Sequence, residues 1–210
     1  LGATPTRGGY RASNGQFFAV GGSKLYRISS SWVATELGTL NTTEGPVSMA
    51  DNGTSLLIVD GTNGYTWNIA GSAFAVITDP DFYAADTVTF QDGYFILNRS
   101  GTQQFFISDL NATTFQPLDI ASAEGSPDIL IGLVSAKQHV YMWGERTTEV
   151  FYNSGDADFP FARIQGAVEG VGASAAHSIA LLDGIPYFLG GSEGGSGIVY
   201  RMKGFQAERI

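Results

Sequence analysis

The sequence predicts an all-β fold, a β-propeller of about five blades with four antiparallel strands in each. Three observations predict it: a repeated turn-and-strand pattern, the spacing of its copies, and a composition suited to short strands. In each copy a turn precedes an apolar strand, and a second turn leads to another apolar strand. With Phe17, Leu56, Tyr94, Val140 and Tyr187 as anchors, the spacings are 39, 38, 46 and 47 residues. Periods of roughly 40 to 50 residues are typical of propeller blades.

The composition favours strands and turns over helices. The 210 residues include 28 Gly, and 43% of the chain is apolar and 12% aromatic. Gly, Asn and Asp supply turns, and the apolar fraction is ample for a core. Only residues 145–152 and 172–179 approach a helical pattern, and the first of these reads better as a strand.

We expect one propeller domain over residues 1–210, with repeats at approximately 8–41, 45–81, 85–123, 126–167 and 172–210. Residues 1–15 are expected to form a lead-in that ends at the first turn. No linker rich in Pro, Gly and Ser divides the repeats, which favours a single domain. Because the chain begins at Leu1 and ends at Ile210 without a stop signal, we expect a fragment of a longer protein with incomplete blades.

The first two repeats each show strands bounded by turn residues. In the first repeat, residues 16–20 and 24–28 are expected to form a hairpin across Gly21 and Gly22. The second repeat has an inner strand at 47–50, followed by strands at 56–59, 65–69 and 74–77. Asp60-Gly61 and Asn63-Gly64 provide the turn between the middle two.

The last three repeats follow the same plan. The expected strands are 87–90, 94–97 and 104–108, then 128–133, 140–143 and 148–152, and finally 179–182, 187–189 and 198–202. Continuous apolar runs such as 56–59 and 129–133 suit strands that are covered on both faces by neighbouring blades.

The charge and the cysteine count exclude several classes of protein. The net charge is −9, and eight acidic residues but no Lys or Arg lie between Arg27 and Arg99. Because DNA binders need clustered cations, we expect no specific nucleic-acid binding. Cysteine is absent, so there is no disulfide or thiolate metal site. No apolar run reaches about 18 residues, so no membrane contact is expected.

The residues that could carry catalysis or bind a metal form no recognisable group. His139 and His177 stand alone, and Asp156-Ala157-Asp158 lacks the other ligands of a calcium loop. No Gly-x-Ser-x-Gly elbow occurs. Four further carboxylates sit beside Gly or Pro and are interpreted as turn formers: Asp60, Asp79, Asp92 and Asp183. We therefore predict no catalytic residue, no metal, no cofactor and no enzymatic activity.

An ordered set of motifs resembles a known family. The set comprises Thr148-Glu149-Val150-Phe151-Tyr152, Phe159-Pro160-Phe161, Glu169-Gly170-Val171-Gly172-Ala173, Leu189-Gly190-Gly191 and Ala207-Glu208-Arg209-Ile210, with residues 45–50, 106–110 and 126–128 upstream. This order resembles the packaged-DNA stabilisation proteins of short-tailed bacteriophages, also called tail accessory factors or tail hub proteins. The likeness covers nearly the whole chain.

The resemblance implies a structural virion protein, made in the host cytoplasm and located in the phage tail. Such proteins attach below the portal, extend the tail channel and retain the packaged DNA through protein–protein contacts. The implied partners are the portal or adaptor and the tail needle or tailspike proteins. The full-length protein would associate in a ring, whereas this fragment is expected to be monomeric.

The candidate protein interface is the segment with Asp156, Asp158, Phe159 and Phe161, which joins acidic residues to two aromatics around a proline. Exposed aromatics in a loop often mark contact sites. The alternative is that Phe159 and Phe161 fold into the core. A second functional reading is a glycan-binding or glycan-cleaving propeller, for which Trp67, Tyr83 and residues 156–161 are the candidates.

Overall fold

The structure, a computed structural model, describes residues 4–123, 125, 127–192 and 195–210. Ser126, with which the fourth expected repeat begins, lies outside them. The regular secondary structure of the described chain is almost all strand: β1 to β21 are joined by turns and loops, with one short 3₁₀ helix, η1 (Ala176–Ser178). No helix in this part of the chain is long and apolar enough to cross a membrane. The all-β prediction is confirmed.

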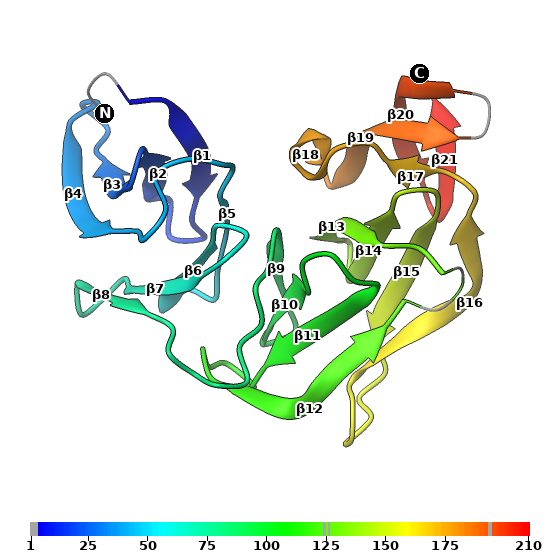
Figure 1. The fold of residues 1–210 in the computed structure, drawn as a ribbon, viewed down its shortest axis with the longest axis horizontal. Coiled ribbons are helices and arrows are strands. Elements are labelled where there is room, and N and C mark those ends of the chain that lie inside the picture. The colour runs from blue at the N-terminus through cyan, green and yellow to red at the C-terminus, as the bar shows by residue number, and fades with distance from the viewer. Residues whose placement is uncertain (1–3, 124, 126, 193–194) are drawn as a thin grey trace. The chain divides into compact units, whose positions relative to one another are not determined.

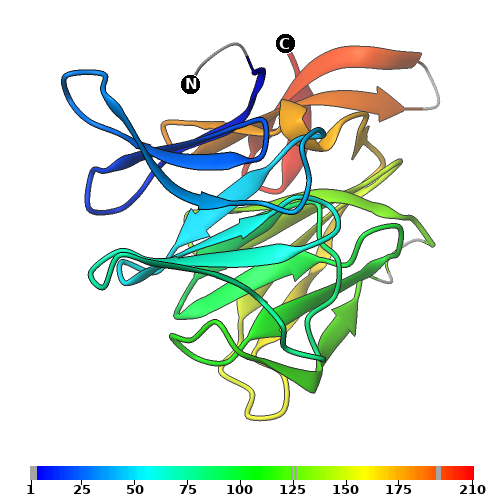
Figure 2. The same ribbon diagram turned by 60° about the vertical axis from the view of Figure 1, so that its left-hand side comes forward.

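The strands form five antiparallel sheets, and each sheet uses strands that follow one another in the sequence. The first sheet contains β1 (Thr6–Arg11), β2 (Phe17–Gly21), β3 (Lys24–Ile28) and β4 (Ala34–Thr39). The second contains β5 (Ser48–Asp51), β6 (Ser55–Val59), β7 (Gly64–Asn68) and β8 (Ala73–Val76). Figures 1 and 2 show the strands of each sheet side by side.

The remaining sheets repeat this order. The third contains β9 (Val88–Gln91), β10 (Tyr94–Asn98), β11 (Gln104–Ser108) and β12 (Phe115–Ser122). The fourth contains β13 (Leu130–Ala136), β14 (His139–Gly144), β15 (Thr148–Asn153) and β16 (Phe161–Glu169). The fifth has the order β17 (Gly172–Ala173), β19 (Ile185–Ser192), β20 (Gly195–Lys203) and β21 (Gln206–Arg209), with β18 (Ala180–Leu182) also paired to β19. Four consecutive antiparallel strands are the plan of a propeller blade.

Two compact units divide the chain: Leu1–Phe95 with Ser108–Gln116, and Ile96–Ile107 with Pro117–Ile210. In the first unit, Phe18, Val20 and Leu25 of the first sheet pack with Leu56 and Ile58 of the second. These side chains are fully buried because a strand alternates its faces and this face meets the neighbouring sheet.

The core of the second unit joins the fourth and fifth sheets in the same way. Trp143 and Val150 pack with Phe188, Tyr200 and Met202. The Trp143 and Phe188 ring centroids are 5.3 Å apart, and those of Phe188 and Tyr200 are 5.6 Å apart. The apolar runs of the sequence therefore become the contacting faces of successive sheets.

The expected lead-in over residues 1–15 is wrong in one respect, because it contains the strand β1. Its sequence has no apolar alternation, and Gly8 and Gly9 lie at its centre. Gly8 is required by packing: a Cβ there would come within 2.5 Å of the Val47 carbonyl oxygen. The Val47 N–H in turn donates to the Arg7 carbonyl at 3.1 Å.

The two segments with near-helical patterns do not form α-helices. Residues 148–153 form the strand β15, as expected for the first of them. In the second, β17 is followed by η1, whose single turn ends where Ile179 becomes extended. Several hairpin turns hold non-glycine residues in the left-handed region, including Asp92, Lys137, Gln138 and Asp183. These match the primed turns that fit the twist of paired strands.

Candidate functional surfaces

The carboxylate of Asp60 is committed to the turn that joins β6 and β7. It accepts from the N–H groups of Thr62 and Asn63 at 3.1 and 2.7 Å, and from the hydroxyls of Thr42 and Tyr65 at 2.6 and 2.7 Å. Asp60 is only 8% exposed. Its oxygens are therefore saturated by structural donors.

These contacts move two pKa values in opposite directions. Burial alone would raise the pKa of Asp60, but the hydrogen bonds from Thr42, Asn63 and Tyr65 outweigh it and hold that pKa below its ordinary value. Burial, together with the hydrogen bond to Asp60, raises the pKa of the Tyr65 phenol to about 12. The pair is therefore stable as a neutral phenol bound to a carboxylate.

Asp51 makes a second buried site of the same kind. It accepts from the Ser13 N–H and hydroxyl at 2.9 and 2.5 Å, from the Tyr10 hydroxyl at 2.8 Å, and from the Gly53 N–H at 2.9 Å. Burial would raise its pKa, but these donors together lower it. The cluster ties the turn after β1 to the end of β5.

The other suspected turn formers also lie in turns, Asp79 through its carboxylate and Asp92 and Asp183 through their backbone conformation. Asp79 accepts from the N–H groups of Asp81 at 3.0 Å and Phe115 at 2.9 Å. Asp92 and Asp183 occupy left-handed positions in hairpin turns, with φ of 51° and 53°. The interpretation of Asp60, Asp79, Asp92 and Asp183 as turn residues is confirmed.

Two acidic side chains of the second unit are also structural. Asp128 accepts from the backbone N–H groups of Glu145, Arg146 and Thr147 at 2.8 to 3.0 Å. Glu149, which is 2% exposed, accepts from the Gly125 N–H at 2.9 Å and pairs with Arg163 at 3.2 Å.

The two histidines lie in different settings. His139 begins β14 and meets the Phe205 ring edge-on, with centroids 5.1 Å apart. His177 lies in η1. Within the described ranges, no three His, Cys, Asp or Glu side chains come together in a way that could hold a metal ion.

The predicted interface segment is the hairpin loop between β15 and β16, the yellow loop at the lower edge of Figure 1. It is closed by the Ser154 N–H and hydroxyl, which donate to the Pro160 carbonyl at 2.7 and 3.0 Å. Asp156 and Asp158 are exposed, and the Asp158 N–H donates to the Asp156 carboxylate at 2.9 Å. The loop therefore presents two carboxylates to solvent in a fixed turn.

The two phenylalanines of this segment behave differently from one another. Phe159 is half-buried, and its ring packs edge-on against Phe105, with centroids 5.6 Å apart. Phe161 is 4% exposed at the start of β16, so it serves as a core residue. The surface that could meet a partner consists of Asp156, Asp158 and the exposed part of Phe159; its role as an interface stays a prediction.

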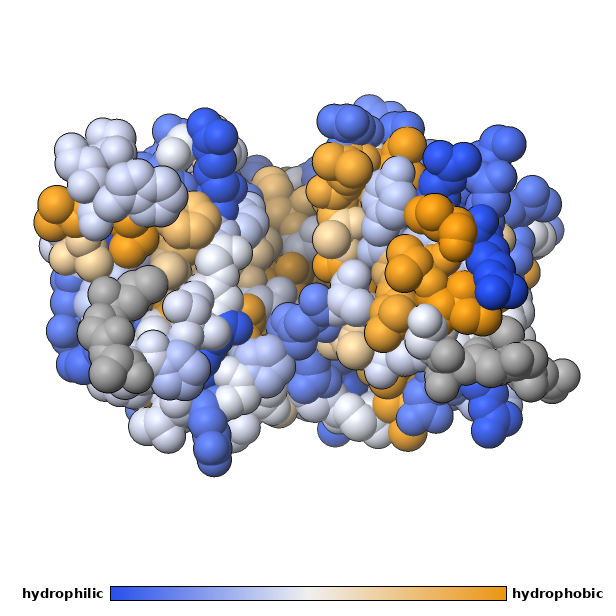
Figure 3. All heavy atoms as spheres, turned by 90° about the horizontal axis from the view of Figure 1, so that it is seen from above, coloured by the Kyte–Doolittle hydropathy of each residue, from blue (hydrophilic) through white to orange (hydrophobic). Residues whose placement is uncertain are grey.

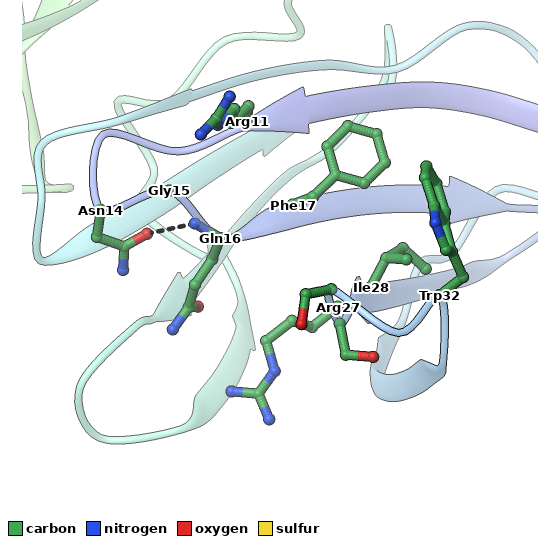
Figure 4. A pocket seen from close by; sticks show the side chains of 10 residues that line it. Arg11, Asn14, Gly15, Gln16, Phe17, Arg27, Ile28 and Trp32 are labelled. Carbon is green, nitrogen blue, oxygen red and sulfur yellow. Dashed lines mark hydrogen bonds between the residues drawn. The ribbon is translucent and has the colours of Figure 1, made fainter.

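A hollow of about 850 Å³ lies at the end of the first sheet, where the β1–β2 and β3–β4 turns meet. Arg11, Phe17, Arg27, Ile28 and Trp32 contribute to its lining (Figure 4). Sequence reasoning missed it. The available signal was Trp32 itself, a large aromatic placed after three serines in a turn instead of within a strand.

Apolar side chains also gather on the fifth sheet. Leu181, Leu182, Val199 and Ile210 are 45 to 67% exposed. Figure 3 shows hydrophobic residues collected over this sheet. Of the aromatics considered for glycan binding, Trp67 is 4% exposed and belongs to the core, whereas Tyr83 is half-buried. Trp67 therefore has no face free to stack on a sugar.

Comparison with known families gives a match over almost the whole chain. A family model described as bacteriophage P22 Gp10, beta-propeller, matches residues 2–210. No curated protein sequence matches.

Solved structures resemble the fold at low sequence identity. PorZ, a bacterial surface component of the type-IX secretion system of Porphyromonas gingivalis, is 14% identical with a TM-score of 0.60; the match covers 100% of this chain and 28% of PorZ. The extracellular domain of the hybrid two-component system BT4673 of B. thetaiotaomicron is 13% identical with a TM-score of 0.52, covering 100% of this chain and 34% of that one. The chain thus spans about a third of these structures, and the likeness shows the fold alone.

Proposed function

The chain belongs to the phage stabilisation family of bacteriophage P22 Gp10, and we propose that it attaches below the portal, extends the tail channel and so retains the packaged DNA. Membership makes it a β-propeller protein of the virion that stabilises DNA in a structural role. The match over residues 2–210 is the observation that carries the proposal.

The packing of the sheets favours loops as the contact surfaces. Within each unit, successive sheets bury their apolar faces against one another. Edges and loops remain available for recognition, as is usual for propellers. We propose the β15–β16 loop, with Asp156, Asp158 and the exposed part of Phe159, as one contact with a portal, adaptor, needle or tailspike protein.

The charge supports retention by contact between proteins. With a net charge of −9, the chain offers few cations to neutralise phosphates. Retaining DNA by closing its exit needs no phosphate contact. We propose that the sheets belong to a single propeller domain and that the full-length protein forms a ring. No observation on the described residues favours the glycan-binding alternative.

The test adds the full-length protein to DNA-filled heads that carry the portal and lack this protein. The measurement is the fraction of DNA that stays protected from nuclease. Wild-type protein should protect the DNA and co-elute with the portal complex in gel filtration. Failure of wild-type protein to do either would contradict the proposed role.

The loop is tested in the same assay by D156K/D158K. Reversing both charges should weaken co-elution without changing the melting temperature, since both side chains are exposed. The matched control is E44K/E145K, which reverses two other exposed carboxylates whose side chains bind no other described residue. Equal loss in both variants would show a general charge effect and would remove the loop from the interface.

A further inference from the structure

Trp32 is held out from the first sheet by a fixed turn. The Trp32 N–H donates to the Ser29 carbonyl at 2.9 Å, and the Ser29 N–H donates to the Val33 carbonyl at 2.9 Å. The Val33 N–H also donates to the Ser29 hydroxyl at 3.1 Å. Trp32 has φ of 60° and is 84% exposed. A bulky residue is rare in this region, and strained residues of this kind gather at functional sites.

The indole stands beside further apolar surface. Strand register aligns Arg11 with Phe17, and Phe17 with Ile28, so the three side chains share one face. Phe17 is 39% exposed. Figure 4 shows Phe17 and Trp32 rising on the same side of the sheet, with Ile28 between them and Arg11 beyond Phe17. Two aromatic rings therefore flank an aliphatic floor.

The hollow also contains polar side chains that have no partner within the described part of the chain. Arg11 and Arg27 have no hydrogen-bond or ion-pair partner among the described residues. The hollow continues around the end of the sheet to Arg27 and Gln16, which point to the other side in Figure 4. The Gln16 Oε1 atom is buried and lacks a donor. The site therefore offers two free cations and one unpaired acceptor in a chain of net charge −9.

We propose that this hollow binds a short acidic peptide segment of another protein, with an aromatic or aliphatic side chain seated between Phe17 and Trp32. Carboxylates of the segment would pair with Arg11 and Arg27, and a peptide N–H would donate to Gln16. Exposed aromatics and Arg are the side chains that most often carry binding energy at protein interfaces.

Charge complementarity favours a peptide over a nucleic acid. A long polyanion would meet the acidic remainder of the chain, including the stretch without a cation from residue 28 to 98. A segment with two or three carboxylates meets only the two arginines.

The test uses the intrinsic fluorescence of the 210-residue chain. Trp67 and Trp143 are 4% and 0% exposed, so acrylamide quenching reports mainly on Trp32. The probe is a synthetic Gly-Asp-Ala-Asp-Phe-Gly peptide, with Gly-Asn-Ala-Asn-Phe-Gly as its uncharged counterpart. The acidic peptide should reduce quenching and bind at least about tenfold more tightly than the uncharged one, and about 0.5 M salt should weaken it.

Variants assign the binding to the hollow. R11E/R27E should abolish it, whereas R146E/K203E, which reverses two cations in the other unit, should leave it unchanged. W32A removes the fluorescent reporter, so its peptide binding is measured by calorimetry, and it should be weaker than that of the wild type. Because Trp32 lies in an exposed turn, W32A tests the site even if R11E/R27E does not fold. No binding of the acidic peptide, or binding that neither R11E/R27E nor W32A affects, would overturn the proposal.

Other occupants would be recognised in the same experiments. A single-stranded oligonucleotide that binds more tightly than the peptide, and loses binding in W32A, would overturn the proposal in favour of a nucleic acid. A dimer in sedimentation that W32A disrupts would overturn it in favour of a second copy. Peptide binding is measured on the isolated chain, so its result is separate from the DNA-retention assay.

Discussion

At the scale of single residues, the acidic side chains of the turns are part of the folding chemistry. Asp51 and Asp60 are nearly buried, and each accepts four hydrogen bonds from nearby donors. The sequence identified Asp60 as a turn residue because Gly61 follows it. It could not identify Tyr10, Ser13 or Thr42 as donors, since these lie 18 to 41 residues away from the carboxylates they bind.

These carboxylates predict a stability that depends on pH. The folded pKa values of Asp51 and Asp60 lie below the ordinary value of 3.8. Their contribution is therefore complete above that value and is lost as the pH falls through the folded pKa values. Urea unfolding at a series of pH values should show stability falling below about pH 4. In D51N/D60N the free energy of unfolding at neutral pH should drop by about 2 kcal/mol or more. The loss of stability below pH 4 should also become smaller in this variant. An acid profile identical to that of the wild type would contradict the role given to these two carboxylates.

Tyr65 predicts a second change at high pH. Its pKa is raised from 10.0 to about 12, so its contribution is complete below pH 10 and is lost between those two values. Y65F removes the titrating hydroxyl and serves as the comparison in the same unfolding series. A wild-type curve that matches Y65F between pH 10 and 12 would show that this phenol does not titrate with folding.

In the β15–β16 loop, the core residue Phe161 lies only three positions after the exposed Asp158 and five after the exposed Asp156. Phe161→Ala should destabilise the protein by about 3–5 kcal/mol, because it empties a buried site at the start of β16. D156K/D158K should change stability by less than about 0.5 kcal/mol, as exposed positions usually do. Chemical denaturation of both variants checks this. If Phe161→Ala were as stable as the wild type, Phe161 would not be a core residue.

At the scale of the elements, the outer and first strands were the hardest to predict. The middle strands of the sheets are predicted well by continuous apolar runs such as Leu56, Leu57 and Ile58, all fully buried. The strands β4, β12 and β16 alternate polar residues and are largely exposed, so periodicity gives a weak signal. The strand β1 has no periodic signal at all. Its Gly8 is needed because the Val47 carbonyl lies too close for a side chain, and this contact cannot be read from the sequence. Trp32 could be recognised as an aromatic in a turn, but its left-handed backbone could not, since nothing in a run of serines indicates a positive φ.

The outer strands of the first two sheets predict a sharp packing effect. A Cβ at Gly38 of β4 would lie 2.3 Å from the ring of Phe74 in β8, so Gly38→Ala should cost about 1–3 kcal/mol. Gly170→Ala is the matched control, since no atom lies within 4 Å of its Cβ and its φ is not positive. Equal urea midpoints for the two variants would mean that Phe74 moves aside freely.

At the scale of the whole molecule, the charge distribution predicts weak interaction with duplex DNA. With 11 basic and 20 acidic residues, and Arg7 and Arg163 engaged in internal contacts, few cations remain to form a phosphate track. Anisotropy of a labelled duplex should show no saturable binding at micromolar protein in low salt. Salt-sensitive micromolar binding would contradict this and would require DNA contact in the stabilising role.

The contiguous order of the strands has a consequence for how the protein is made. Every described sheet is built from strands that follow one another in the sequence, and none of these sheets includes a strand from a distant part of the sequence. Short-range pairing of this kind favours rapid closure. Each sheet can therefore form soon after its own residues leave the ribosome, which shortens the time that unpaired edges are open to aggregation.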